Sequence, residues 1–65
     1  MMVMWLNFGD EMVNMDAVSQ VTKKKVDGRW VIVFFRFDGS YMTSLDYDSD
    51  TEAEEDFNNI KEAVQ

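Results

Sequence analysis

Two Asp-Gly pairs, Asp27-Gly28 and Asp38-Gly39, place the tightest limits on how this chain can fold. Asp-Gly supplies the two positive-φ positions of a type I′ turn, and both pairs lie between segments rich in β-branched and aromatic residues. Each pair therefore predicts a tight hairpin, so that three strands follow one another. These strands are expected at about residues 18–26, 29–37 and 40–47. The segment between the two turns, RWVIVFFRF, is apolar almost throughout, which predicts a central strand.

The residues before these strands predict a further hairpin. Two apolar runs, MVMWLN and EMVNM, flank Gly9, which can take the left-handed position in a loop of about three to four residues. Asn14 and Asp16 follow, and their side chains can close an Asx-turn or cap a short helical turn. We expect this turn to lead the chain from the first hairpin into the next strand.

After Tyr47 the apolar residues change from the period of a strand to that of a helix. One helical stripe contains Ala53, Phe57, Ile60 and Val64. Ser49 and Glu52 fit the S-x-x-E capping box, which predicts a helix start. The predicted fold is α+β: one domain over residues 1–65, with a small antiparallel sheet of about four to five strands in a meander over residues 2–47 and one C-terminal α-helix, residues 50–63, packed on one face.

Two-residue turns would fix the register of this sheet and the composition of each face. Across the second turn, Ile32 would oppose Leu45. The other expected pairs are Lys25 with Trp30, Lys23 with Ile32, Val21 with Phe34, Phe34 with Thr43 and Trp30 with Tyr47. The face expected to carry the helix contains Val21, Trp30, Ile32, Phe34, Tyr41, Leu45 and Tyr47.

The opposite face of the predicted sheet is the main sequence clue to function. It carries the apolar residues Val31, Val33, Phe35, Phe37 and Met42. One helix cannot cover both sides of a sheet, so this face must be covered by the N-terminal hairpin, by a second copy of the chain, or by a different protein. These residues are the predicted partner or self-association patch, and a homodimer is the expected oligomer.

The net charge of −7 comes from the end of the chain. Residues 1–45 hold five acids and five bases, whereas residues 46–65 hold eight acids and a single base, Lys61. Such a field repels nucleic-acid phosphates and acidic lipid and favours basic partners, and it also keeps a small apolar protein in solution. The predicted electrostatic surface comprises Asp50, Glu52, Glu54, Glu55 and Asp56.

Three of the acids, Asp46, Asp48 and Asp50, match the first half of an EF-hand calcium loop. The second half does not fit, because Thr51 replaces the glycine of the sharp turn and Phe57 replaces the bidentate glutamate. We therefore assign these acids to the start of a helix, where carboxylates stabilise the positive end of the helix dipole. No metal or other cofactor is expected.

Catalysis is not expected from the residue types present. The chain has no histidine and no cysteine, so the usual nucleophile and base pairs are missing, and its three glycines stand apart rather than in a phosphate-binding loop. The apolar start MMVMWL is too short for a membrane span and lacks the basic region of a signal peptide. A cytoplasmic protein without a membrane segment is the expectation, and the lack of cysteine agrees with a reducing compartment.

A single-stranded nucleic-acid-binding domain is the alternative. Basic and aromatic residues alternate along the expected strands over residues 21–36, as on sheets that grip single strands. The residues concerned are Lys23, Lys25, Arg29, Trp30 and Arg36. The order of strands followed by a helix also resembles the layout of single-stranded DNA coactivator domains. Lys24 points to the opposite face from its neighbours, however, and lysines on an edge strand also prevent edge-to-edge aggregation.

The sequence thus predicts a small acidic protein-interaction module without enzymatic activity. It would act as a regulator or inhibitor of a basic or nucleic-acid-binding protein, as expected of a phage-type or accessory bacterial protein. Nucleic acid and membranes are not the expected partners.

Overall fold

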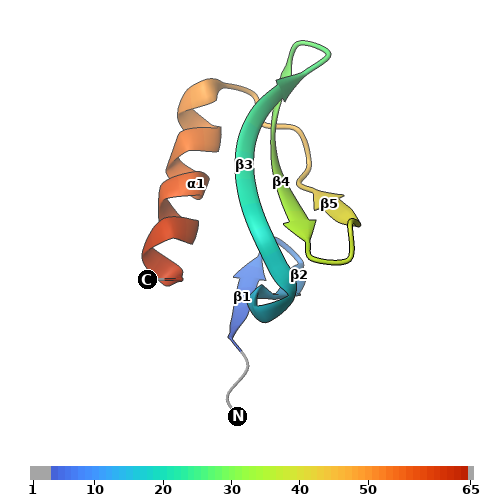
Figure 1. Cartoon of the computed structure of the whole chain (residues 1–65). Coiled ribbons are helices and arrows are strands. Elements are labelled where there is room, and N and C mark those ends of the chain that lie inside the picture. The colour runs from blue at the N-terminus through green and yellow to red at the C-terminus, as the bar shows by residue number, and fades with distance from the viewer. Residues whose placement is uncertain (1–3, 65) are drawn as a thin grey trace.

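The computed structural model describes residues 4–64, and within them the chain forms five strands, one 3₁₀ turn and one helix (Figure 1). The elements in chain order are β1 (Trp5–Phe8), β2 (Glu11–Asn14), a 3₁₀ turn (Met15–Ala17), β3 (Val18–Val26), β4 (Arg29–Arg36), β5 (Tyr41–Thr43) and α1 (Asp50–Ala63). The α+β class and the antiparallel strands are confirmed, but the single meander is wrong. β1 and β2 form a separate two-stranded sheet, and β3, β4 and β5 form a three-stranded one.

The break between the two sheets lies at the polar residues after β2. Asn14 caps the 3₁₀ turn, because its Oδ1 accepts a hydrogen bond of 3.0 Å from the backbone N of Asp16. This turn was one of the two alternatives predicted for these residues. It redirects the chain, so that β2 pairs only with β1 and β3 starts a new sheet. The predicted start of the first strand at residue 2 lies outside the described residues.

The first two hairpins have two-residue loops. Gly9 has φ of 61° and takes the first central position of its loop, as glycine does in a type II′ turn, so the loop is shorter than predicted. Asp27 and Gly28 both have positive φ, 51° and 81°, which agrees with the predicted type I′ turn. The register between β3 and β4 is as predicted, with Lys25 opposite Trp30, Lys23 opposite Ile32 and Val21 opposite Phe34.

The turn between β4 and β5 differs from the prediction by one residue. Arg36 N donates a 2.8 Å hydrogen bond to Ser40 O, which leaves residues 37–39 as a three-residue loop with only Gly39 at positive φ. Asp38 favours this longer loop, because its carboxylate accepts hydrogen bonds from the backbone N of Ser40 at 2.8 Å and from Ser40 Oγ at 2.6 Å. The pKa of Asp38 is lowered, and the largest cause is the hydrogen bond from the Ser40 hydroxyl.

This one-residue shift changes which side chains face the core. Phe34 now lies opposite Met42 instead of Thr43, and Met42 packs against the core although it was predicted on the other face. Leu45 was predicted opposite Ile32, yet its side chain is 91% exposed. The predicted bridge from Trp30 to Tyr47 is nevertheless present, because an extra residue between Ser44 and Tyr47 restores the register.

The helix and the N-terminal hairpin share one face of the three-stranded sheet. The core consists of Leu6 and Val13 from the hairpin, Ile32 and Phe34 from β4, and Ile60 from α1. The Phe8 ring also packs edge-on against Phe34, with ring centroids 5.1 Å apart. The hairpin therefore does not cover the face that carries Val31 and Val33, and the first of the three predicted coverings does not occur.

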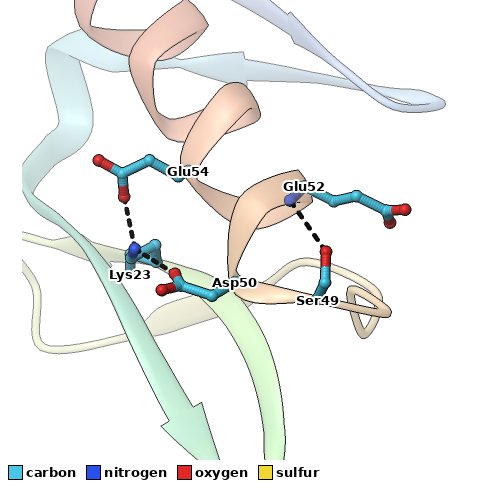
Figure 2. Close-up of polar contacts among 5 residues, drawn as sticks. All are labelled: Lys23, Ser49, Asp50, Glu52 and Glu54. Atoms are coloured by element: carbon cyan, nitrogen blue, oxygen red, sulfur yellow. Dashed lines mark hydrogen bonds and ion pairs between the residues drawn. The ribbon is translucent and has the colours of Figure 1, made fainter.

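The helix has the bounds that the sequence predicts. Ser49 is the N-cap, and its Oγ accepts a 3.2 Å hydrogen bond from the backbone N of Glu52 (Figure 2). Ala53 and Ile60 of the predicted stripe are buried against the sheet, and Phe57 packs beside them. Figure 1 shows α1 running along the length of the long strands β3 and β4.

Candidate functional site

The predicted apolar patch is smaller in the structure than in the sequence. Val31 and Val33 are only 6% and 4% exposed within the single chain, and Met42 faces the core. Val33 sits between Thr22 of β3 and Thr43 of β5, so neighbouring strands shield it on both sides. Of the five predicted patch residues, half-buried Phe35 and exposed Phe37 are the two that offer substantial surface on the predicted face.

The part of the predicted patch that remains exposed lies at the end of the sheet where β4 turns into β5. Phe37 is 75% exposed, and Tyr41 is exposed beside Phe35, with the two ring centroids 6.1 Å apart. We call Phe35, Phe37 and Tyr41 the aromatic rim. Phe35 and Tyr41 lie together, and Phe37 is exposed two residues after Phe35 in the chain. Exposed aromatic side chains of this kind are typical of protein-interaction surfaces.

The predicted electrostatic surface on α1 divides into two parts. Lys23 of β3 reaches two of its carboxylates, with Nζ 2.5 Å from Asp50 Oδ1 and in contact with Glu54 Oε2 (Figure 2). Tyr47 donates a 2.7 Å hydrogen bond to a third carboxylate, that of Asp56. Over residues 4–64, the last two acids of the prediction, Glu52 and Glu55, take part in no ion pair and are exposed.

Lys23 serves as a link between the sheet and the helix. The pKa of the Lys23 ammonium group is raised most by its hydrogen bond to Asp50 and next by its hydrogen bond to Glu54. The same Nζ lies 4.9 Å from the centroid of the Trp30 ring, which adds a cation–π contact. Asp50 and Glu54 are therefore structural partners of β3 more than they are docking groups for another molecule.

The predicted nucleic-acid surface is also partly used inside the chain. Arg29 Nη1 lies 2.8 Å from Asp46 Oδ2, and this hydrogen bond, as the largest cause, raises the pKa of Arg29. Arg36 donates a 3.0 Å hydrogen bond to Ser40 Oγ. Lys25 remains exposed and its Nζ lies 5.9 Å from the centroid of half-buried Trp30. Two of the predicted contacts, Lys23 and Arg29, are thus neutralised by acids from the end of the chain.

Sequence reasoning missed a groove between the β1–β2 loop and the segment that connects β5 to α1. Its volume is about 450 Å³. The apolar part of its lining is Phe8, Met42 and Leu45, and its acidic part is Asp10, Glu11, Asp46 and Asp56. These residues come from three separate segments, and Leu45 lines the groove only because the three-residue loop turns it out of the core. Leu45 is an isolated apolar residue in the polar segment after β5, and it is the one local feature of the sequence that indicates this groove.

Tyr47 also lines this groove and holds it to the helix. Burial of the phenol raises the pKa of Tyr47, and the hydrogen bond to Asp56 raises it further. Tyr47 therefore stays protonated and donates to Asp56 throughout the neutral range.

Neither metal binding nor a membrane span is indicated by the geometry. Among residues 4–64, no group of three or more acidic, cysteine or histidine side chains is arranged to hold a metal ion. The helix in that part of the chain has neither the length nor the apolar character needed to cross a membrane.

Comparison with known proteins assigns neither a family nor a function to the chain. No family model matches the chain, and no curated protein or solved structure is significantly similar to it. Function is therefore inferred from the surfaces of the chain itself.

Proposed function

We propose that this protein is a non-enzymatic interaction module that binds a basic protein partner. The observation that carries the proposal is the uneven use of charge within the fold. Lys23 and Arg29 are held in internal ion pairs, whereas Glu52 and Glu55 on α1 are exposed and take part in no ion pair within residues 4–64. Within the described residues, ion pairs hold three of the thirteen acids and two of the six bases, which leaves ten acids and four bases outside them. The surface offered to other molecules is therefore acidic on balance, and a basic surface is its electrostatic complement.

Regulation or inhibition of a basic target follows from this surface. An acidic module that occupies a cationic site competes with whatever anion the target normally binds, including the phosphates of a nucleic acid. The absence of cysteine agrees with action in the cytoplasm.

Self-association through the aromatic rim is a second candidate function. The exposed positions of Phe37 and Tyr41, next to half-buried Phe35, favour it. Sedimentation equilibrium of the purified chain tests it: a dimer that becomes a monomer on Phe37→Ser supports the rim as the contact. A wild-type monomer at high concentration would contradict this candidate and leave the basic partner as the sole proposal.

The experiment for the main proposal compares two baits in an extract of the native host. The first is the wild-type chain, and the second carries Asp10→Asn, Glu11→Gln, Glu52→Gln and Glu55→Gln, which removes four exposed charges and spares the link at Lys23. We expect the wild-type bait to retain a basic protein that is released by salt and lost from the second bait. Retention of the same proteins by both baits, or of acidic proteins, would contradict the proposal.

A further inference from the structure

We propose that the groove between the β1–β2 loop and the β5–α1 connection is the docking site for a short peptide segment of the partner, in which arginine or lysine stands next to a large apolar residue. This inference rests on the proposed function, because it assumes a basic protein partner. It adds where the partner binds and what local chemistry it must present.

The size and apolar lining of the groove suit side chains of a peptide. Its volume of about 450 Å³ falls within the range of ligand-binding pockets. Phe8 and Met42 also pack against the core, so they form a fixed apolar surface rather than a mobile one. Leu45 adds an apolar side chain that is 91% exposed and would lose that exposure when a ligand fills the groove. An apolar side chain of the partner therefore has a matching surface here.

The charges of the lining select a basic neighbour for that apolar side chain. The groove is lined by four acids and by no lysine or arginine. Asp46 and Asp56 already have partners, since Asp46 pairs with Arg29 and Asp56 accepts from Tyr47. Asp10 and Glu11 are exposed, and neither takes part in an ion pair within the described part of the chain. A guanidinium or ammonium group next to the apolar anchor would supply their counter-ion.

The wall of the groove that follows β5 is held in place before any ligand binds. Ser44 and Ile32 exchange two hydrogen bonds: Ser44 N donates to Ile32 O at 2.8 Å, and Ile32 N donates to Ser44 Oγ at 2.9 Å. Tyr47 fixes the other end of this segment to β4 and to α1. A preformed site loses less conformational entropy on binding, which favours recognition of a short segment.

The test is selection of a displayed library of random peptides against the full chain, followed by affinity measurements on the enriched sequences. We expect enrichment of peptides with arginine or lysine beside leucine, phenylalanine or tryptophan. The groove variant, Asp10→Asn with Glu11→Gln, should weaken their binding about tenfold or more, as should Leu45→Ser. The matched control is Asp27→Asn with Glu62→Gln, two exposed acids outside the groove and outside any ion pair in the described residues, which removes the same charge and should change affinity by less than about threefold. The α1 variant, Glu52→Gln with Glu55→Gln, measures separately what the helix carboxylates contribute.

The possible outcomes separate this inference from the proposed function. If basic peptides are enriched but lose binding only in the α1 variant, the groove is the wrong site while a basic partner still stands. If enrichment fails, or if the enriched peptides lack basic residues, the groove is refuted, and the two-bait experiment decides independently on the basic partner. Circular dichroism of each variant checks folding, which all of these exposed positions should preserve.

Discussion

A matched pair of truncations tests the register of β4 and β5, on which both the core and the groove depend. Met42 is half-buried against the core, whereas Leu45 is 91% exposed. Truncation of a fully buried Leu, Ile or Met to Ala costs about 2–5 kcal/mol, so for half-buried Met42 we expect Met42→Ala to lower the free energy of unfolding by about 1–2 kcal/mol. Leu45→Ala removes no buried surface and should change it by less than about 0.5 kcal/mol.

Urea unfolding followed by tryptophan fluorescence measures both variants, since half-buried Trp30 lies in the central strand. With a urea slope of about 1 kcal/mol per molar, Met42→Ala should lower the midpoint by about 1–2 M and Leu45→Ala by less than about 0.5 M. Thermal melts should agree, at about 4–8 °C for each kcal/mol. Met42→Leu is the volume-conserving control and should cost less than about 1.5 kcal/mol.

A larger loss for Leu45→Ala than for Met42→Ala would refute the three-residue loop. It would restore the register with Ile32 opposite Leu45, which two-residue turn geometry predicts. The lining of the groove would then lose Leu45 as well, so the same result would remove the apolar anchor of the proposed docking site.

Three further predictions concern the helix, the pH dependence of stability and the nucleic-acid alternative. Ile60→Ala should cost about 2–4 kcal/mol in urea unfolding because Ile60 is buried against the sheet, whereas Asn59→Ala on the exposed side should cost less than about 0.5 kcal/mol; equal costs would contradict the docking of α1. The raised pKa of Tyr47 contributes stability that is complete below its ordinary value of 10.0 and is lost as the pH rises toward the raised pKa, so Tyr47→Phe should reduce the fall in melting temperature above about pH 10. An unchanged alkaline fall would contradict the burial of the phenol and its hydrogen bond to Asp56. Fluorescence anisotropy with a labelled single-stranded oligonucleotide at low salt should show no binding, and binding that weakens steeply with added salt would restore the alternative.

The helix and the β3–β4 hairpin were predictable because local chemistry determines them. Ser49 caps the helix through the backbone N of Glu52, three residues away, and Asp27-Gly28 closes its turn without help from the rest of the chain. The β4–β5 turn has the same dipeptide, yet the Asp38 side chain closes a longer loop through Ser40. Dipeptide preference therefore predicted a hairpin at both places but the correct register at only one.

The division into two sheets and the candidate site depend on contacts between distant residues. The Asn14 cap was predictable, but the packing of Leu6 and Val13 on the helix side of the sheet was not, since both faces of the central strand are apolar. Lys23 meets Asp50 from a distant part of the chain, so a count of charges could not show which acids remain exposed. The groove could not be predicted from the sequence either, because its lining depends on the observed β4–β5 register.

The central claim is that exposed carboxylates of this fold bind a basic protein. The most direct measurement is isothermal titration of the purified chain with the protein that the wild-type bait retains, over a range of salt concentrations. We expect affinity to fall as salt increases, and to fall about tenfold or more at low salt in the four-carboxylate variant described above. Equal affinity for the wild-type chain and that variant, with no dependence on salt, would contradict the claim.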